Sequence, residues 1–196
     1  RFLDGALTAN LAAYYIDWRN IQVQANRVSD SVQFATNIGG AESYGLEYEI
    51  MVRPLQGLSL ALNGSYNHAE VNRLTASEAA ISGAVLGVQL ASPHFQGSET
   101  LRYDFAASPT VNAFASINVS HAGSFPNQFP NTPGRPNVPV ATHDYTDAWT
   151  NVNLYAGATF NGINVTAYVE NLLNDKSVTY VHPEAFLDGR YARLRP

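Results

Sequence analysis

Histidine side chains are the first candidates for chemistry in this sequence, because they ligate metals and transfer protons near neutral pH. There are five, at positions far apart in the chain: His68, His94, His121, His143 and His182. None belongs to an HExxH or comparable metal-binding spacing, so we expect surface or interface histidines and no metal site. One alternative stays open: His143 stands beside Asp144 and near Asp147 in a long polar stretch that could bind a cation or a ligand.

Carboxylate pairs are the second candidates. Glu47 and Glu49 are two residues apart, so in an extended strand they point to the same side. General acid–base catalysis needs a desolvated cleft, which the open face of a sheet does not provide. Arg102, which precedes Tyr103 and Asp104, is likewise expected to place a charge on the polar face of its strand. No GxSxG, P-loop or GxGxxG motif stands in a meaningful context and the chain has no cysteine, so we predict no catalysis and no cofactor.

Composition narrows the class of protein. A net charge of −5 without a long basic run argues against nucleic-acid binding. The chain has no run of about eighteen apolar residues, which excludes a membrane-spanning helix. It does not exclude a β-barrel, whose polar inner face lowers the mean hydropathy. The content of 11 Tyr and 9 Phe against 1 Met favours strands. The chain opens without a signal peptide, as expected for a mature protein or a piece of a larger one.

Alternating apolar and polar residues predict the strands that carry these side chains. In residues 44–52 the even positions are mostly apolar and the odd positions mostly polar, which is the period of a strand with two different faces. Similar runs follow tight turns and therefore predict hairpins, most strongly at Asn161-Gly162. The expected strands number seven: about 6–24, 44–52, 58–66, 95–105, 111–119, 152–160 and 163–169.

The connectors alternate in length. Tight turns alternate with polar stretches of roughly fifteen to thirty residues. A transmembrane β-barrel has the same arrangement, with short periplasmic turns and long outer loops. The tight turns are Leu3–Gly5, Pro54–Gly57, Ala107–Pro109 and Asn161–Gly162. Aromatic residues near the strand ends also fit the two interfacial girdles of such a barrel. We therefore predict an all-β fold, an antiparallel up-and-down meander that forms part of a transmembrane β-barrel.

Four segments give the chain a family resemblance. They are Ala13–Trp18 with Ile21–Gln24, Asn37–Glu49, Leu58–Tyr66 and Val169–Lys176. Each resembles a strand motif from the C-terminal part of the β-barrel of TonB-dependent outer-membrane receptors, and they occur in the expected order. The resemblance implies that residues 1–196 are a partial barrel of about seven strands. The plug domain is absent, and the chain stops where the family would start its final strand.

The resemblance also implies a function. In this family a scarce ligand, most often a ferric siderophore, binds the outer loops and the plug, and the TonB complex pulls on the plug to release it inward. The expected location is the outer membrane, in contact with its lipid. The residues expected to face ligand or plug in the lumen are Glu47, Glu49, Asn63, Asn67 and Arg102. The candidates in outer loops are His94, Phe125, Phe129, His143 and Trp149.

Two alternatives remain at the sequence level. A passive porin or another outer-membrane barrel would have the same strand pattern without a plug. A soluble secreted β-sandwich that binds carbohydrate would also alternate, and its aromatic loops would be the site. The loop at 123–136 is too long for a plain hairpin connection, and loops of this length are usually functional or disordered. It either contacts ligand or is an ordinary exposed loop. Its prolines restrict the backbone and its phenylalanines offer apolar contacts.

Overall fold

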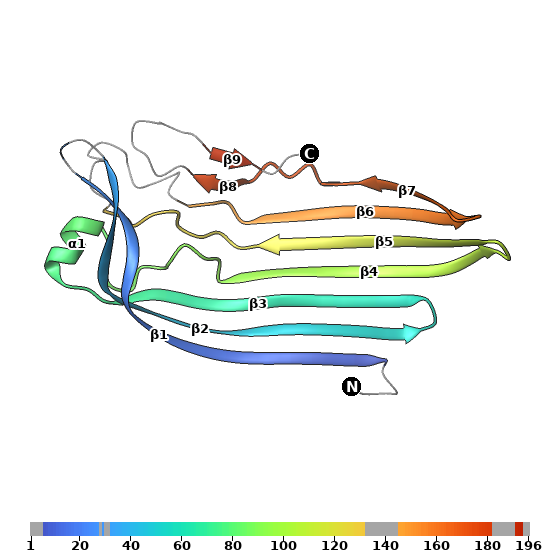
Figure 1. Ribbon diagram of the computed structural model, residues 1–196, viewed down its shortest axis with the longest axis horizontal. Helices are drawn as coiled ribbons and strands as arrows, with labels where there is room; N and C mark the ends of the chain where they lie inside the picture. The colour runs from blue at the N-terminus through green and yellow to red at the C-terminus, as the bar shows by residue number, and fades with distance from the viewer. Residues whose placement is uncertain (1–5, 28, 30–31, 132–144, 182–190, 194–196) are drawn as a thin grey trace.

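The computed structural model describes residues 6–27, 29, 32–131, 145–181 and 191–193. Seven strands form one antiparallel sheet in which every strand pairs with its neighbours in sequence, an up-and-down meander (Figure 1). The strands are β1 Leu7–Asn26, β2 Gln33–Leu55, β3 Leu58–Arg73, β4 Phe95–Ser108, β5 Val111–Ala122, β6 Trp149–Phe160 and β7 Ile163–Val169. The predicted fold class is confirmed.

A second, small sheet follows the large one. It consists of β8 Val178–Val181 and β9 Tyr191–Arg193, which pair antiparallel with each other. The sequence pattern missed both because strands of 4 and 3 residues are too short to show a period of two. It also missed the outer parts of β2 and β3, which have 23 and 16 residues and extend well beyond the predicted 44–52 and 58–66.

The tight turns lie together at one end of the sheet. Gly57 and Gly162 adopt φ angles of 81° and 78°, and Asn161 adopts 48°. This left-handed backbone is the conformation that hairpin turns require and that Gly and Asn tolerate. The turn between β4 and β5 includes a register shift between Ala106 and Ser108. The predicted turn at Leu3–Gly5 lies outside the described residues.

The strand register gives the sheet two different faces. Residues directly opposite each other in neighbouring strands point the same way, so cross-strand rows define each face. One face, called here the polar face, carries rows such as Asn10, Glu49, Asn63, Ser98, Ser120 and Asn151. The other, the apolar face, carries rows such as Leu60, Leu101, Ile117, Leu154 and Val169.

The apolar face has no second layer over it among the described residues. Leu11, Leu46 and Val165 are 79%, 59% and 66% exposed, respectively. A sandwich would bury such a face against a second sheet, so this architecture does not fit the soluble sandwich. Within the described part of the chain, no helix is both long and apolar enough to cross a membrane.

The long connectors gather at the opposite end from the tight turns. The one between β3 and β4 contains α1, Ala76–Ser82, which begins with a capping box between Thr75 and Glu78 and ends at Gly83 with φ 74°. Figure 1 shows the joined outer halves of β1 and β2 turning away from the sheet at this end, past α1. A small apolar core lies here, made of Ile21, Ile38, Ala41 and Ala84 with Val23, Leu74, Leu90 and Phe129 packed against it.

Candidate functional site

A hollow on the polar face lies over one cross-strand row. The row runs through Ala12, Glu47, Ser65, Gln96, Ala122 and Trp149, one residue from each of β1 to β6. These residues, together with Asn10, Glu49 and Asn63 of the next row toward the tight turns, line a hollow of about 580 Å³. Glu47 on β2 and Trp149 on β6 lie far apart in this row. Between them the uncharged residues Ser65, Gln96 and Ala122 form the floor of the hollow. This arrangement can hold a ligand by a charged group and by an aromatic ring.

The acidic end of this hollow is exposed. Glu47 and Glu49 are both exposed. Asn10 Nδ2 donates to Glu49 Oε2 at 3.1 Å, and Asn63 lies directly opposite Glu49 in the register. Exposed carboxylates with amide neighbours can accept hydrogen bonds from a bound molecule or a neighbouring domain, but they lack the desolvation that acid–base catalysis needs.

Asn67, another predicted residue, stands toward the outer connectors and makes three side-chain hydrogen bonds within the chain. Its Oδ1 accepts from Tyr14 Oη at 2.9 Å and from Ser43 Oγ at 2.8 Å. Its Nδ2 donates to Ser92 Oγ at 2.8 Å. The side chain therefore ties β1, β2 and the β3–β4 connector together, and its groups are committed to the fold.

Arg102 belongs to a separate cluster nearer the tight turns. Its Nε and Nη2 donate to the Asp104 carboxylate at distances from 2.7 to 3.1 Å. The guanidinium lies 3.9 Å from the centroid of the Phe114 ring, a cation–π contact. Phe114 in turn lies over Gly157, where an added Cβ would come within 2.5 Å of Phe114 Cε1. The glycine thus makes room for a ring that holds the cation flat against the polar face.

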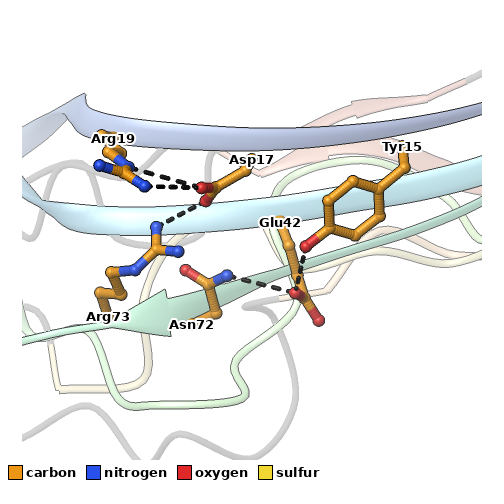
Figure 2. A network of polar contacts seen from close by, with 6 residues as sticks. All are labelled: Tyr15, Asp17, Arg19, Glu42, Asn72 and Arg73. Atoms are coloured by element: carbon orange, nitrogen blue, oxygen red, sulfur yellow. Dashed lines mark hydrogen bonds and ion pairs between the residues drawn. The ribbon is translucent and has the colours of Figure 1, made fainter.

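Charged side chains, among them Asp17, Glu42 and Arg73, gather near the outer connectors (Figure 2). They follow the rows of the apolar face and lie beyond the aromatic pair Tyr15 and Tyr44. Arg73 Nη1 on β3 donates to Asp17 Oδ1 on β1 at 2.6 Å. This bond from the Arg73 guanidinium holds the pKa of the Asp17 carboxyl below its usual range. The network joins strands that are not neighbours, because β2 lies between β1 and β3.

Glu42 extends that network toward β1 and β3. Its Oε2 accepts from Tyr15 Oη and from Asn72 Nδ2, each at 3.2 Å. Arg19 adds a longer contact to Asp17, at 3.4 Å, and is the more exposed of the two arginines. These polar groups fix the outer halves of β1 and β2 relative to β3.

The predicted loop residues separate into different environments. Trp149 lines the hollow on the polar face. Phe129 packs against the small apolar core, and Phe125 is partly buried, with its backbone N–H bonded to Thr146 Oγ1. His94 stacks on Tyr66 and His68, which belong to the apolar face, with centroid distances of 6.3 and 5.5 Å. His143 lies outside the described residues.

Sequence reasoning missed several residues of the polar face. Gln96 lies in the middle of the row between Glu47 and Trp149. Asn118 Nδ2 donates to Ser98 Oγ and Thr100 Oγ1 at 3.0 and 2.9 Å, bridging β5 to β4. The alternating pattern places each of these on its strand's polar side, but only the register between strands reveals which ones meet. In the described part of the chain, no three His, Asp or Glu side chains group closely enough to hold a metal ion.

The sequence matches a family model described as TonB dependent receptor-like, beta-barrel, over residues 1–172. The chain belongs to this family. It is a fragment of a TonB-dependent receptor barrel, and the sheet described above is part of the wall of such a barrel. The sequence matches no curated protein.

Solved structures of TonB-dependent receptors share this fold. The ferric-catecholate import receptor Fiu from Escherichia coli K12 aligns with a TM-score of 0.68 at 15% identity, covering 100% of this chain and 24% of that receptor. The ferric yersiniabactin uptake receptor FyuA from Yersinia pestis gives 0.64 and 17%, covering 90% and 24%. BauA, the ferric preacinetobactin receptor from Acinetobacter baumannii, gives 0.63 and 16%, covering 98% and 26%. The chain thus spans about a quarter of the length of these receptors.

Proposed function

We propose that this chain forms part of the wall and outer loops of an outer-membrane receptor that imports a scarce ligand, a ferric siderophore, in a step driven by TonB through the receptor's plug. The observation that carries the proposal is the polar face of a TonB-dependent receptor barrel, with its hollow between Glu47 and Trp149. The similar receptors are described as receptors for ferric yersiniabactin, ferric preacinetobactin and ferric catecholates, which makes ferric siderophores the first ligand class to test.

The two faces suit this role. The exposed Leu, Val and Ile side chains of the apolar face would lie against lipid, and the polar face would line the lumen. Glu47, Glu49, Asn63 and Gln96 would contact plug or ligand with exposed or partly exposed amides and carboxylates. Arg102 would present its guanidinium near the periplasmic end as one half of an ion pair with Asp104.

Uptake by the receptor that contains this chain tests the proposal. We would express it in a Gram-negative host that lacks its own siderophore receptors. Cells would be given radioactive iron bound to a catecholate, a hydroxamate or citrate, with TonB present or deleted. We expect accumulation of at least one iron chelate, and its loss without TonB.

A passive porin would give a different result. It would let small solutes pass whether or not TonB is present, and the iron chelate would not accumulate against its gradient. Accumulation that is unaffected by TonB deletion would therefore contradict the proposal, as would the absence of uptake for all chelates by a folded receptor.

A further inference from the structure

A second hollow lies among the outer connectors. It shares no lining residue with the hollow between Glu47 and Trp149. Three segments enclose it: the outer half of the β1–β2 hairpin, the β3–β4 connector and the β5–β6 connector. Its volume is about 240 Å³. This is smaller than the pockets that hold drug-sized ligands, so the hollow suits a ligand of about one ring.

Carboxamides form the polar part of this lining, called here the outer hollow. They belong to Gln24, Gln33, Gln89, Asn127 and Gln128, and none of the residues that line the outer hollow is charged. Each carboxamide offers both a donor and an acceptor. A charged ligand would find no opposite charge among these side chains, and an unpaired charge is costly to take out of water. The lining therefore favours an uncharged molecule that forms hydrogen bonds.

Several of these polar groups lack a partner in the described part of the chain. Gln24 Nε2 donates to Gln33 Oε1 at 2.6 Å, which leaves the Gln24 carbonyl oxygen and the Gln33 amino group without a hydrogen bond. Gln89 Nε2 donates to the Ser92 carbonyl at 2.7 Å and leaves Gln89 Oε1 unbonded. Asn127 Nδ2 is buried and has no acceptor, although buried polar groups nearly always have a partner. Unused donors and acceptors thus come from all three segments.

The rest of the lining is apolar. Phe129 and Pro126 contribute rings, and Val23, Leu90 and Ala91 contribute aliphatic side chains. Phe129, Val23 and Leu90 also pack against the small apolar core, which holds this side of the outer hollow in place. An apolar ligand would fit these side chains but would leave the carboxamides unpaired. A sugar ring fits both parts, because its hydroxyl groups donate and accept and its C–H groups suit apolar side chains and the face of an aromatic ring.

We propose that the outer hollow binds one uncharged sugar residue. The hydroxyl groups of the sugar would pair with Gln24, Gln89 and Asn127, and its C–H groups would lie against Phe129 and Pro126. Two sources present the same ring, a soluble glycoside and a glycolipid of the membrane surface, and the experiment below separates them. The inference does not depend on iron uptake, because the outer hollow is separate from the hollow on the polar face.

Saturation-transfer difference NMR on the intact receptor tests this binding, because the method detects small ligands that bind weakly. The receptor would be kept in a detergent without a sugar headgroup, so that the detergent does not compete. The probes are the methyl glycosides of glucose, galactose, mannose and N-acetylglucosamine, with glucuronic acid and glucosamine as charged comparisons. We expect a saturation signal from at least one neutral glycoside and none from the two charged sugars.

Substitutions show whether the sugar lies in the outer hollow. Gln24→Leu and Asn127→Leu each remove a carboxamide and should weaken binding roughly fivefold, the loss expected for one hydrogen bond. Ala91→Trp should fill the hollow and abolish binding. Gln56→Leu is the matched control, because Gln56 is an exposed carboxamide in the tight turn between β2 and β3. Heat-modifiable migration on gels shows which variants are folded.

A conservative variant separates a binding role from a structural one. Gln24→Glu keeps an acceptor oxygen and adds a negative charge, and Gln33 can turn its amide to donate to it. This variant should still bind the neutral glycoside and should begin to bind glucosamine, whose ammonium group would meet the new carboxylate. A side chain that only supports the hairpin would not change the charge of the sugar that binds.

Lipopolysaccharide separates the two sources of the sugar. The receptor would be placed in phospholipid nanodiscs, with or without added lipopolysaccharide from the same organism, and the NMR signal of the neutral glycoside would be compared. Loss of the signal on adding lipopolysaccharide assigns the outer hollow to a sugar of the membrane surface. An unchanged signal assigns it to a soluble glycoside.

Three results would overturn the inference. They are a folded receptor that binds none of the neutral glycosides, equal binding of neutral and charged sugars, and binding that is unaffected by Gln24→Leu, Asn127→Leu and Ala91→Trp. A receptor that binds a glycoside but imports no chelate would contradict the proposed function and leave this inference standing. A receptor that imports a chelate but binds no glycoside would do the reverse.

Discussion

Asp17 and Arg73 show how single residues position the outer part of the wall. Their 2.6 Å ion pair reaches from β1 to β3 across β2. It lies beyond Tyr15 and Tyr44, where the outer halves of β1 and β2 leave the sheet. Surface ion pairs are individually weak, but this one also carries a direct hydrogen bond from Arg73, and the Glu42–Tyr15 hydrogen bond joins β2 to β1 beside it.

Breaking this pair should loosen the outer half of the β1–β2 hairpin. Asp17→Asn removes the charge that Arg73 contacts, so we expect faster cleavage near the tip of the hairpin in limited proteolysis of the folded receptor. Arg19→Ala is the matched control, since Arg19 is more exposed and its contact is longer. Equal cleavage rates for Asp17→Asn and the unmodified receptor would show that the pair does not hold the hairpin.

Acid should have the same effect as that substitution. The pKa of Asp17 is lowered in the folded state by the bond from Arg73. Its stabilising contribution is therefore complete above the unfolded pKa of about 4 and is lost as the pH falls through the folded value. We expect acid-activated protease to cleave the hairpin faster as the pH drops through this window. In Asp17→Asn the acceleration from this group should be missing, and an unchanged pH profile would contradict the assignment.

The cross-strand row beneath the hollow gives the third prediction at this scale. Trp149→Ala removes the ring that lines one end of the hollow. We expect a ferric siderophore that the receptor imports to bind about tenfold more weakly, a loss of about 1.4 kcal/mol, with the heat-modifiable barrel intact. Phe160→Ala on the apolar face of the same strand is the control. If both variants bind the chelate as the unmodified receptor does, the row does not contact ligand.

At the scale of elements, the outer connectors form one packed layer. Phe129 from the β5–β6 connector, Ala84 from the β3–β4 connector, and Ile21 and Ile38 from the β1–β2 hairpin share the small apolar core. Asn131 N–H also donates to the Gly83 carbonyl at 3.0 Å, which joins two connectors through their backbones. The predicted ligand-contact residue Phe129 thus has a structural role in the loops.

Truncating Phe129 should therefore disturb three connectors at once. Phe129→Ala leaves a cavity in a partly buried cluster, for which we expect a local cost of about 2 kcal/mol, at the low end for large core truncations. Amide hydrogen exchange should become faster at Ile21 and Ile38 but not in the paired part of β5 and β6. Phe125→Ala is the control, since its ring is not part of the core. Unchanged exchange at Ile21 in Phe129→Ala would contradict a shared core.

The same scale shows what the sequence could predict. The hairpins from β2 to β7 were predictable because apolar and polar residues largely alternate in their strands and tight turns interrupt the pattern. The outer half of β2 was not, because Gly39, Gly40 and Ala41 interrupt the alternation there. The structural partners of Phe129 and Asn67 include Ile38 and Tyr14, which are remote in sequence. Such contacts depend on register, which one strand's pattern does not contain.

At the scale of the whole molecule, the sheet is a wall whose two faces need different surroundings. Its buried side chains gather at the outer end, and large apolar residues remain exposed along the strands. In water this face would be an aggregation hazard, whereas in a barrel wall it is the surface that lipid covers. If this chain is part of a membrane receptor, its apolar face must meet lipid and its polar face must line the lumen.

Spin-label accessibility along β4 tests the assignment most directly. Single cysteines would be placed at successive positions from Gly97 to Phe105 in the receptor, labelled, and measured in lipid bilayers with oxygen and a water-soluble nickel chelate as relaxing agents. We predict that oxygen accessibility rises and falls with a period of two, with maxima at Leu101 and Tyr103 and minima at Thr100 and Arg102. Absence of alternation, or maxima at Thr100 and Arg102, would contradict a wall with lipid on its apolar face and the lumen on its polar face.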